Sequence, residues 1–417
     1  MNNFNQLEKK ISKFLRLNPM LHSKVKLFYQ KFVYFLNKKN FFKFELNKDC
    51  EIFDLKVNNS FFGYYDHTPW SKDMKHFILH VEKQKTIQLN LYSFSNNKIS
   101  FKKTLVTSKF YNLQQGVRPI WVNNNEIIFN QVIDNKLISS IYNISNNSIK
   151  NFNFPVQELF LKNNIIFSID YTKINFLNKD YGYSLKSQFF QEETDSIFGY
   201  NYIQKNLIFK LKTNRIHQKS KNCNLSFDNC EINHLHHSSY DDSFIFIYRN
   251  KNHKGYSELY HYNYKTDNLL RLYSGKMLSH YCWINKSAVF AYLEHKGVAA
   301  FFEINFEDTN SIYFSKNILN QSLDNTGDGH PSISGNNKWI VYDSYPDKAR
   351  HSHLYLIRNN NNSDKLLIGK FLSPLQFNGY NRCDLHPRWS PDGKLISIDS
   401  SYDGSRKSYL IDVSKII

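Results

Sequence analysis

The spacing of hydrophobic residues divides the chain into a helical arm, 1–48, and a β-rich remainder, 49–417. In the arm, the stretches LEKKISKFLRL and KVKLFYQKFVYFLNKK place Leu, Ile, Phe and Tyr three and four residues apart, with Lys and Arg between them. This spacing predicts one or two basic amphipathic helices. In the remainder, apolar residues alternate with polar ones over short runs between polar turns, which is typical of β-strands.

The β-rich part repeats one pattern seven times. Each copy has an entry segment, a polar turn and a strand with alternating apolar residues, and the clearest copy is HPRWSPDGKLISID at 386–399. There, Pro391 sets φ for the turn and Gly393 tolerates a positive φ. The copies are anchored, mainly 36 to 56 residues apart, at Pro69, Pro119, Pro155, His236, Tyr281, Pro331 and Pro387.

Repeats of this period, each built from about four short strands, are typical of a β-propeller. We expect an all-β fold with seven blades, or six if the weak third copy, PVQELFLKNNIIFSID, is not a blade. The strand EIFDLK at 51–56 is predicted to complete the last blade and close the ring. The main insertion is expected at about 176–230, and insertions in repeat folds form loops on one face, often the binding face.

Histidines recur at or just before the first strand of successive repeats. Because the first strand of every blade lines the axis of a propeller, these side chains are expected to converge there. Three imidazoles and a thiolate from this set would suit Zn²⁺ or a similar divalent metal. A structural role, with each imidazole bonded to a neighbouring blade, is the alternative. The predicted metal ligands are His280, His330, Cys383 and His386.

Other polar residues at the repeat entries are candidates for proton transfer and for binding a glycan. His67 or Tyr65 can move a proton, and Asp66 can orient a base. The amide of Gln115 and the guanidinium of Arg118 suit sugar hydroxyls and carboxylates. Each of these residues also has a purely structural reading. The further candidates are Tyr183, His234, Arg249, Arg382 and Arg388.

The formal net charge of +18 would attract nucleic acid, anionic lipid or acidic polysaccharide, although solubility and codon bias explain it equally well. The sequence has no Arg/Gly-rich tract or recognisable nucleic-acid module, which argues against nucleic acid. No signal-peptide pattern and no long apolar run is evident, so we expect a cytoplasmic protein. Residues 1–45 are then either an arm that contacts an anionic membrane or a partner, or a helix packed on the main domain.

Several motifs resemble a known family. GYYDHTPW, QQGVRP, KDYGY, DGHPSISGNNKWIVYDSYPD and RCDLHPRWSPDGKLISIDSSYDG are similar to a bacterial group of propeller proteins found among polysaccharide genes. That group resembles the ulvan lyases and, more distantly, the oligogalacturonate lyases. The resemblance covers about residues 60–414 and implies β-elimination on a uronic-acid polysaccharide. In such lyases His and Tyr serve as base and acid, Arg neutralises the carboxylate, and a metal braces the site.

Carried onto this chain, the resemblance assigns the metal to the predicted ligand set and proton transfer to His67 or His234, with Tyr65 or Tyr183 beside them. Three classes of function stay open. The first is a metal-braced lyase acting on an acidic glycan. The second is a glycosyltransferase-like or accessory protein of capsule or lipopolysaccharide assembly, held at the inner membrane by residues 1–45. The third is a scaffold propeller without catalysis.

Overall fold

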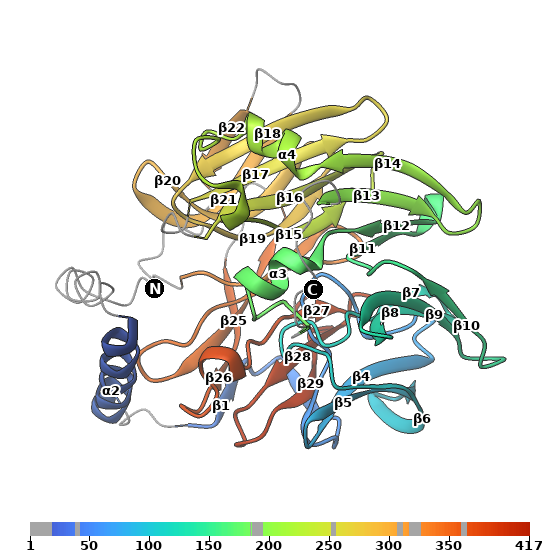
Figure 1. Cartoon of the computed structure of the whole chain (residues 1–417). Coiled ribbons are helices and arrows are strands. Elements are labelled where there is room, and N and C mark those ends of the chain that lie inside the picture. The colour runs from blue at the N-terminus through green and yellow to red at the C-terminus, as the bar shows by residue number, and fades with distance from the viewer. Residues whose placement is uncertain are drawn as a thin grey trace.

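The protein is a seven-bladed β-propeller. The computed structural model describes residues 19–37, 42–183, 185, 195–251, 256–306, 312–316, 327–359 and 365–417. Its strands form seven antiparallel sheets that radiate from a central axis (Figure 1). The third copy of the repeat pairs β11 (Glu158–Phe160) with β12 (Ile165–Ser168), so it is a true blade and the count is seven rather than six.

Strands occur in chain order within each of the first five blades. Blade 1 contains β3 (Ser60–Phe61), β4 (His76–Lys83), β5 (Thr86–Ser95) and β6 (Lys98–Ser108). Blade 2 contains β7 (Ile120–Asn123), β8 (Glu126–Ile133), β9 (Lys136–Asn143) and β10 (Ile149–Phe152). Blade 3 adds β13 (Ser196–Asn201) and β14 (Asn206–Lys212) to β11 and β12. Blade 4 contains β15 (Cys230–His237), β16 (Ser243–Asn250), β17 (Ser257–Asn263) and β18 (Asn268–Gly275). Blade 5 contains β19 (Leu278–Asn285), β20 (Ala288–His295), β21 (Val298–Phe306) and β22 (Ile312–Lys316).

The last two blades combine both ends of the chain. Blade 6 contains β23 (Pro331–Ile333), β24 (Trp339–Asp343), β25 (His351–Arg358) and β26 (Leu366–Leu372). Blade 7 contains β27 (Arg388–Trp389), β28 (Leu395–Ser400), β29 (Lys407–Asp412) and, from the other end of the chain, β2 (Glu51–Asp54). The pairing of Glu51 with Asp412 confirms that the 51–56 segment closes the ring.

Two boundaries differ from the sequence prediction. Residues 44–46, which we assigned to the helical arm, form β1 (Phe44–Leu46) and pair with β26 as a fifth strand of blade 6. The range 176–230, expected to be one insertion, contains β13 and β14 of blade 3. These strands were missed because the whole range was taken as one insertion, and β14 is a short outer strand in which only Phe209 and Leu211 are buried.

The remaining helices are short, apart from α2 (Pro19–Asn37) in the arm. They are α3 (Tyr171–Leu177), α4 (Thr213–Lys219), and the 3₁₀ turns η2 (Leu161–Asn163), η3 (Phe227–Asn229) and η5 (Gly379–Asn381). The predicted helix at LEKKISKFLRL lies outside the described residues. Among the residues that the structure describes, no helix is long and apolar enough to cross a membrane.

Three tryptophans join the inner strands of blades 2, 5 and 7 to the blade before each of them. The indole N–H of Trp121 donates to the carbonyl of Pro69, that of Trp283 to His236, and that of Trp389 to Ser332, at 3.0 to 3.3 Å. The aromatic that follows the entry in several copies is therefore a clamp between blades. These clamps hold the entry segments in place around the axis.

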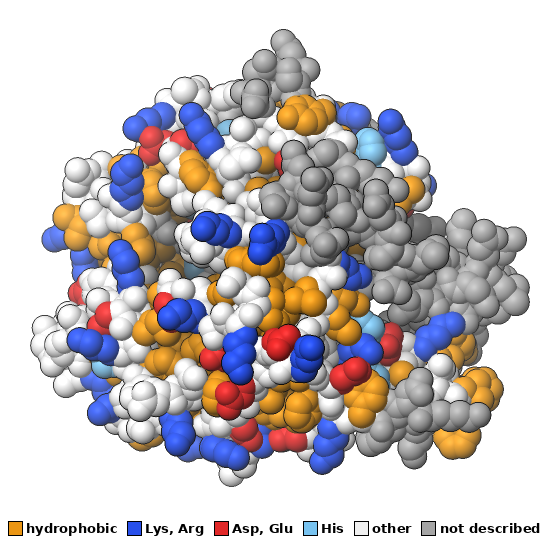
Figure 2. Space-filling view, turned by 180° about the vertical axis from the view of Figure 1, so that it is seen from behind, with side chains coloured by type: hydrophobic (Ala, Val, Ile, Leu, Met, Phe, Trp, Pro, Cys, Tyr) orange, Lys and Arg blue, Asp and Glu red, His pale blue; other side chains and the backbone are white. Residues whose placement is uncertain are grey.

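One face of the ring carries all of the repeat entries, and we call it the entry face. The first strand of a blade leaves this face and the second returns to it, so the links between second and third strands also lie there. The segment containing α3 is such a link, and it crosses in front of the ring centre in Figure 1. Seen from behind, Lys and Arg are scattered between apolar side chains rather than gathered into one stripe (Figure 2).

Candidate metal-binding and catalytic site

Four histidines from blades 4 to 7 converge at the axis on the entry face, as the repeats predict. The ring centroids of His280 and His330 lie 4.1 Å apart, and those of His330 and His386 lie 4.3 Å apart. The ring of His234 is 5.5 Å from that of His280. All four side chains are buried. We call these residues, together with Tyr64 and Asp384, the entry layer.

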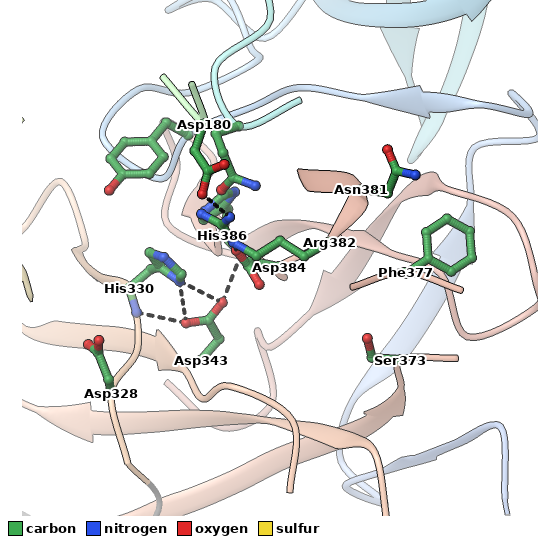
Figure 3. A network of polar contacts seen from close by, with 12 residues as sticks. Asp180, Asp328, His330, Asp343, Ser373, Phe377, Asn381, Arg382, Asp384 and His386 are labelled. Atoms are coloured by element: carbon green, nitrogen blue, oxygen red, sulfur yellow. Dashed lines mark hydrogen bonds and ion pairs between the residues drawn. The ribbon is translucent and has the colours of Figure 1, made fainter. Parts of the chain in front are cut away.

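Asp343, the last residue of β24, holds two of these histidines (Figure 3). The backbone N–H and Nδ1 of His330 lie 2.7 and 2.9 Å from its Oδ1, and the backbone N–H of His386 donates to its Oδ2 at 3.0 Å. With Nδ1–H donating to the carboxylate, Nε2 of His330 is left as a lone-pair ligand, and it is buried without a hydrogen-bond partner. A carboxylate behind an imidazole is the usual second shell of a metal-binding histidine.

The close contact with Asp343 explains the glycine in the sequence DGH at 328–330. A Cβ placed on Gly329 would lie 1.7 Å from the backbone oxygen of Asp343, so only glycine lets the two segments approach. Burial opposes a charge on His330, but the neighbouring Asp343 outweighs it and raises the pKa of this imidazole. A metal bound at Nε2 would have to displace a proton there.

His330, Asp384 and His386 can hold a metal together. One ligand atom from each lies within 4.8 Å of the others, and all three residues are buried. The pKa of His386 is held well below its usual value by burial and by the charges of His330 and Arg388, so the ring is neutral, as a metal ligand requires. Its Nε2 is also buried without a hydrogen-bond partner.

Cys383 and His280, two members of the predicted ligand set, are placed differently. Asp384 is one of the residues whose ligand atoms come together here, whereas Cys383 is not. Burial raises the pKa of the Cys383 thiol to about 12, which keeps it protonated. His280 Nδ1 lies 3.2 Å from Asp328 and 2.8 Å from the Ser279 hydroxyl. The four-residue set stays a prediction, and the geometry favours Asp384 over Cys383.

His234 is placed as a neutral base. Its φ of 52° is in the left-handed region, and the Tyr281 hydroxyl donates to its carbonyl oxygen. Its Nδ1 lies 2.9 Å from the Tyr64 hydroxyl, and its Nε2 is buried without a partner. Burial, followed by the charges of Arg249 and His280, holds the pKa of His234 well below its usual value. In the neutral tautomer whose Nδ1–H donates to the Tyr64 hydroxyl, Nε2 is unprotonated and can accept a proton from a bound substrate.

Tyr64, which the sequence analysis did not select, lies at the centre of the entry layer. Its ring centroid is 5.0 to 6.3 Å from those of His234, His280, His330 and His386. Its hydroxyl is also 3.5 Å from that of Tyr181 in the blade 3 insertion. Burial raises the pKa of Tyr64 well above its usual value, so the phenol stays protonated.

Two arginines border the entry layer. Arg249 donates from Nη2 to the carbonyl of Leu278 at 2.9 Å, and its charge acts on the pKa of His234. Arg382 donates from Nε to Asp384 at 2.8 Å and also pairs with Asp180 (Figure 3). Guanidinium groups in this position suit the carboxylate of an acidic sugar.

A second group of ionisable residues lies deeper along the axis, and we call it the inner cluster: Asp66, His67, Arg118, Glu158 and His236. It begins at Asp66, two residues beyond Tyr64, and it includes His236, two residues beyond His234 on β15. Arg118 Nη2 lies 2.5 Å from Asp66 Oδ2, His236 Nε2 lies 3.5 Å from that oxygen, and His67 Nε2 lies 3.5 Å from Glu158. His67, Asp66 and Arg118 therefore contact one another rather than the metal group.

Tyr65 separates the two groups. Its hydroxyl donates to the carbonyl of Tyr281 at 3.1 Å and accepts from its N–H at 3.2 Å. Its ring centroid is 5.4 Å from that of His330 on one side, and 5.9 Å from that of His236 on the other. The predicted role of Tyr65 in proton transfer stays a prediction, but its hydroxyl is already engaged by the backbone.

The remaining predicted residues take three different places. Both polar side-chain atoms of Gln115 are buried without hydrogen-bond partners. The Tyr183 hydroxyl accepts from Asn130 Nδ2 at 2.9 Å, and Arg388 is buried between the carbonyl of Gly63 and Asp399. Arg388 therefore ties blade 7 to blade 1. The predicted binding roles of these three residues stay predictions.

Comparisons with known proteins agree with the propeller fold. No family model matches the chain, and no curated protein matches it. Among solved structures, it is similar to an oligogalacturonate lyase from Vibrio parahaemolyticus, with a TM-score of 0.59 and 11% identity over 89% of this chain and 96% of that one. An oligogalacturonate lyase in complex with manganese gives a TM-score of 0.59 and 12% identity over 88% of this chain and 96% of that one. At such low identity, these similarities establish the fold alone.

Proposed function

We propose that this protein is a metal-dependent, polysaccharide lyase-like enzyme that acts on an acidic glycan by β-elimination. The observation that carries the proposal is the convergence of three buried, unpartnered Nε2 atoms, those of His234, His330 and His386, beside the guanidinium groups that border the entry layer. Supporting it, the similar structure with manganese is described as an oligogalacturonate lyase, and the entry layer offers imidazole and carboxylate ligands suited to a divalent metal.

In this proposal His330, Asp384 and His386 hold the metal, which would draw charge from the uronate carboxylate and acidify the adjacent C5–H. Zn²⁺ and Mn²⁺ both suit this donor set. Arg249 or Arg382 binds the carboxylate. His234 Nε2 takes the C5 proton, the C5–H electrons form the C4–C5 double bond, and the C4–O bond breaks. The leaving oxygen takes a proton from water. Tyr64 keeps the His234 ring oriented through Nδ1.

The test is the ultraviolet absorbance of the unsaturated uronate product, measured across a panel of acidic glycans with added Mn²⁺ or Zn²⁺. We expect His234→Ala to lower the rate of elimination at least 100-fold, because a general base typically accelerates a reaction by about that factor or more. His261→Ala, a half-buried histidine on β17, is the matched control and should stay within about twofold of the parent protein. No product with any glycan, or an unchanged rate in His234→Ala, would refute the proposal.

A second candidate function, assembly of a capsule or lipopolysaccharide glycan at the inner membrane, is favoured by α2. This helix exposes Phe28, Phe32, Phe35 and Leu36, whose side chains are 73, 53, 72 and 57% exposed. Their spacing places them along one side of the helix. In this proposal the arm of a cytoplasmic protein lies on an anionic membrane, with phenylalanines in the interface and lysines at the headgroups.

Flotation with vesicles that contain anionic lipid tests this second function. The protein should float with these vesicles and not with zwitterionic ones, and Phe28→Ser/Phe35→Ser should lower the bound fraction severalfold. Phe101→Ser, at a 59% exposed phenylalanine on β6, is the matched control. Failure to bind at low salt would exclude the membrane role. If the protein also holds no metal and yields no product, a scaffold propeller is left.

A further inference from the structure

A groove of about 320 Å³ opens on the entry face between blades 2 and 3, beside α3. Its walls come from the β8–β9 turn, the segment after β10, the end of β12, α3 and the start of β13. The proposed function makes no use of it. Among the residues that line it are Asn135, Lys136, Phe154, Ser168, Tyr171, Asn175 and Phe198.

Two aromatic rings form an apolar wall of this groove. Phe154 and Phe198 are both half-buried, and their rings meet edge to face with centroids 5.2 Å apart. Rings fixed in this way present apolar surface without the loss of side-chain freedom that a flexible residue would suffer. The C–H face of a pyranose ring is a flat apolar surface of matching kind, whereas its edge carries hydroxyls that need hydrogen-bond partners.

The polar atoms of the groove meet that second need. Ser168 lines the groove, and its Oγ is buried without a hydrogen-bond partner. A buried hydroxyl in that state is uncommon, and a hydroxyl of a bound ligand would satisfy it. Asn135 adds an exposed side-chain amide at the β8–β9 turn. An apolar wall with a few placed polar groups is the usual composition of a small-molecule site.

The groove is connected to the axial site by the segment that contains α3. Tyr171 lines the groove, and its hydroxyl donates to the side-chain oxygen of Gln157 at 2.5 Å. The backbone carbonyl of Gln157 accepts in turn from Nε of Arg118 at 2.6 Å. Farther along, Asn175 of the groove accepts from the N–H of Tyr183 at 2.6 Å. Tyr181 then reaches Tyr64 in the entry layer. The groove and the axial site thus share one face and one connecting segment.

We propose that this groove is a second glycan subsite, which binds a sugar residue of the same acidic chain some units away from the reacting bond. The sugar ring packs on Phe154 and Phe198, and its hydroxyls bond to Ser168 Oγ and Asn135. The exposed Lys136 at the groove edge supplies a cation for a uronate carboxylate. The proposal rests on the proposed function for its substrate class, and it predicts a preference for long chains.

The experiment measures binding by calorimetry to the full-length protein, using size-graded oligomers of galacturonate, of glucuronate-containing glycans and of mannuronate/guluronate. Phe198→Ala should weaken binding of oligomers of about six or more units roughly tenfold and leave that of trimers unchanged. Ser168→Val should weaken binding of the long oligomers severalfold. Phe176→Ala, at a 75% exposed phenylalanine of α3 outside the groove, is the matched control and should bind as the parent does.

The two proposals fail in different ways. If elimination occurs but Phe198→Ala and Ser168→Val change the binding of long and short oligomers equally, the groove proposal is overturned and the lyase proposal stands. If no glycan is cleaved but long oligomers bind in a Phe198-dependent way, the lyase falls and the groove stands. Binding of no oligomer in any series overturns the groove proposal. Phe198→Leu, checked by its melting temperature, replaces Phe198→Ala if the latter does not fold.

Discussion

The entry layer and the inner cluster lie on the same axis and use the same residue types, yet they differ in what their polar atoms contact. In the entry layer, Nε2 of His234, His330 and His386 is buried without a partner. In the inner cluster, the charged groups of Asp66 and Arg118 meet at 2.5 Å, and Arg118 also donates to the Gln157 carbonyl, while Asp66 Oδ1 and His236 Nε2 are buried without a hydrogen-bond partner. The charged pair holds blades together, whereas the three unpartnered imidazole nitrogens of the entry layer mark a place for a ligand.

Burial also sets the charge of the inner cluster. It raises the pKa of Glu158 to about 8 and lowers that of His67 to about 3, so both are uncharged near pH 7. The nearby Arg118 outweighs burial and keeps the pKa of Asp66 well below its usual value. Glu158 and His67 therefore add no charge to the Asp66–Arg118 ion pair. Such a group is a poor proton relay and a sound structural bridge between blades 1 and 2.

Of the changes that test the comparison of the two groups, removal of Arg118 should have the largest effect, on the free energy of unfolding. Arg118→Met leaves Asp66 buried and uncompensated, which should lower the free energy of unfolding by about 3–5 kcal/mol. Urea denaturation measures this loss. The double variant Asp66→Asn/Arg118→Met removes both charges and should recover most of it. A loss below about 1 kcal/mol would mean that the inner cluster is not a structural bridge.

The metal ligands of the entry layer give the next largest effect. Asp384→Asn should weaken Mn²⁺ or Zn²⁺ binding about 100-fold, equivalent to about 2.7 kcal/mol, because it removes a ligand charge. Cys383→Ser should bind metal as the parent protein does, since its thiol stays protonated and lies outside the group. Calorimetric titration of each protein separates the two. The reverse ranking would restore the ligand set predicted from the sequence.

The pH dependence of stability tests the inner cluster from another side. A carboxyl whose folded-state pKa is raised contributes stability that is present below its unfolded pKa, near 4.5, and is lost as pH rises towards 8. Glu158→Gln removes this titration, so the variant should gain about 2 kcal/mol relative to the parent between pH 5 and pH 9. Urea denaturation at both pH values measures it. Glu51→Gln, at an exposed glutamate, should show no such gain.

The smallest expected effect concerns the tyrosine between the two groups. Tyr65→Phe removes a hydroxyl that bonds twice to the Tyr281 backbone, which should lower the free energy of unfolding by about 1 kcal/mol. The elimination rate of this variant should stay within a few-fold of the parent rate. A fall of 100-fold or more, with metal binding intact, would show that Tyr65 is the proton donor predicted from the sequence.

Much of the fold and part of the site were predictable because they depend on local periodicity. Alternating strands and a repeated turn predict a propeller, and the confirmed seventh blade is completed by the 51–56 segment. Histidines at equivalent positions of successive repeats had to converge, whatever the details of each blade. The outer strand β14 was missed because its range was taken as one insertion, and the edge strand β1 because it has only three residues.

What only the tertiary structure decided is which atoms meet at the axis. Tyr64 and Tyr65 are neighbours in the sequence, and so are Cys383 and Asp384, yet Tyr64 contacts His234 while Tyr65 bonds to the Tyr281 backbone, and Asp384 but not Cys383 joins the metal group. The left-handed φ of 44° at His386 and of 52° at His234 turns each imidazole in a way that residue type does not reveal. The sequence by itself determined the ring of blades and the residues at its entries. The packing of seven blades against one another determined that His67, predicted for proton transfer, lies beside Glu158 in the inner cluster.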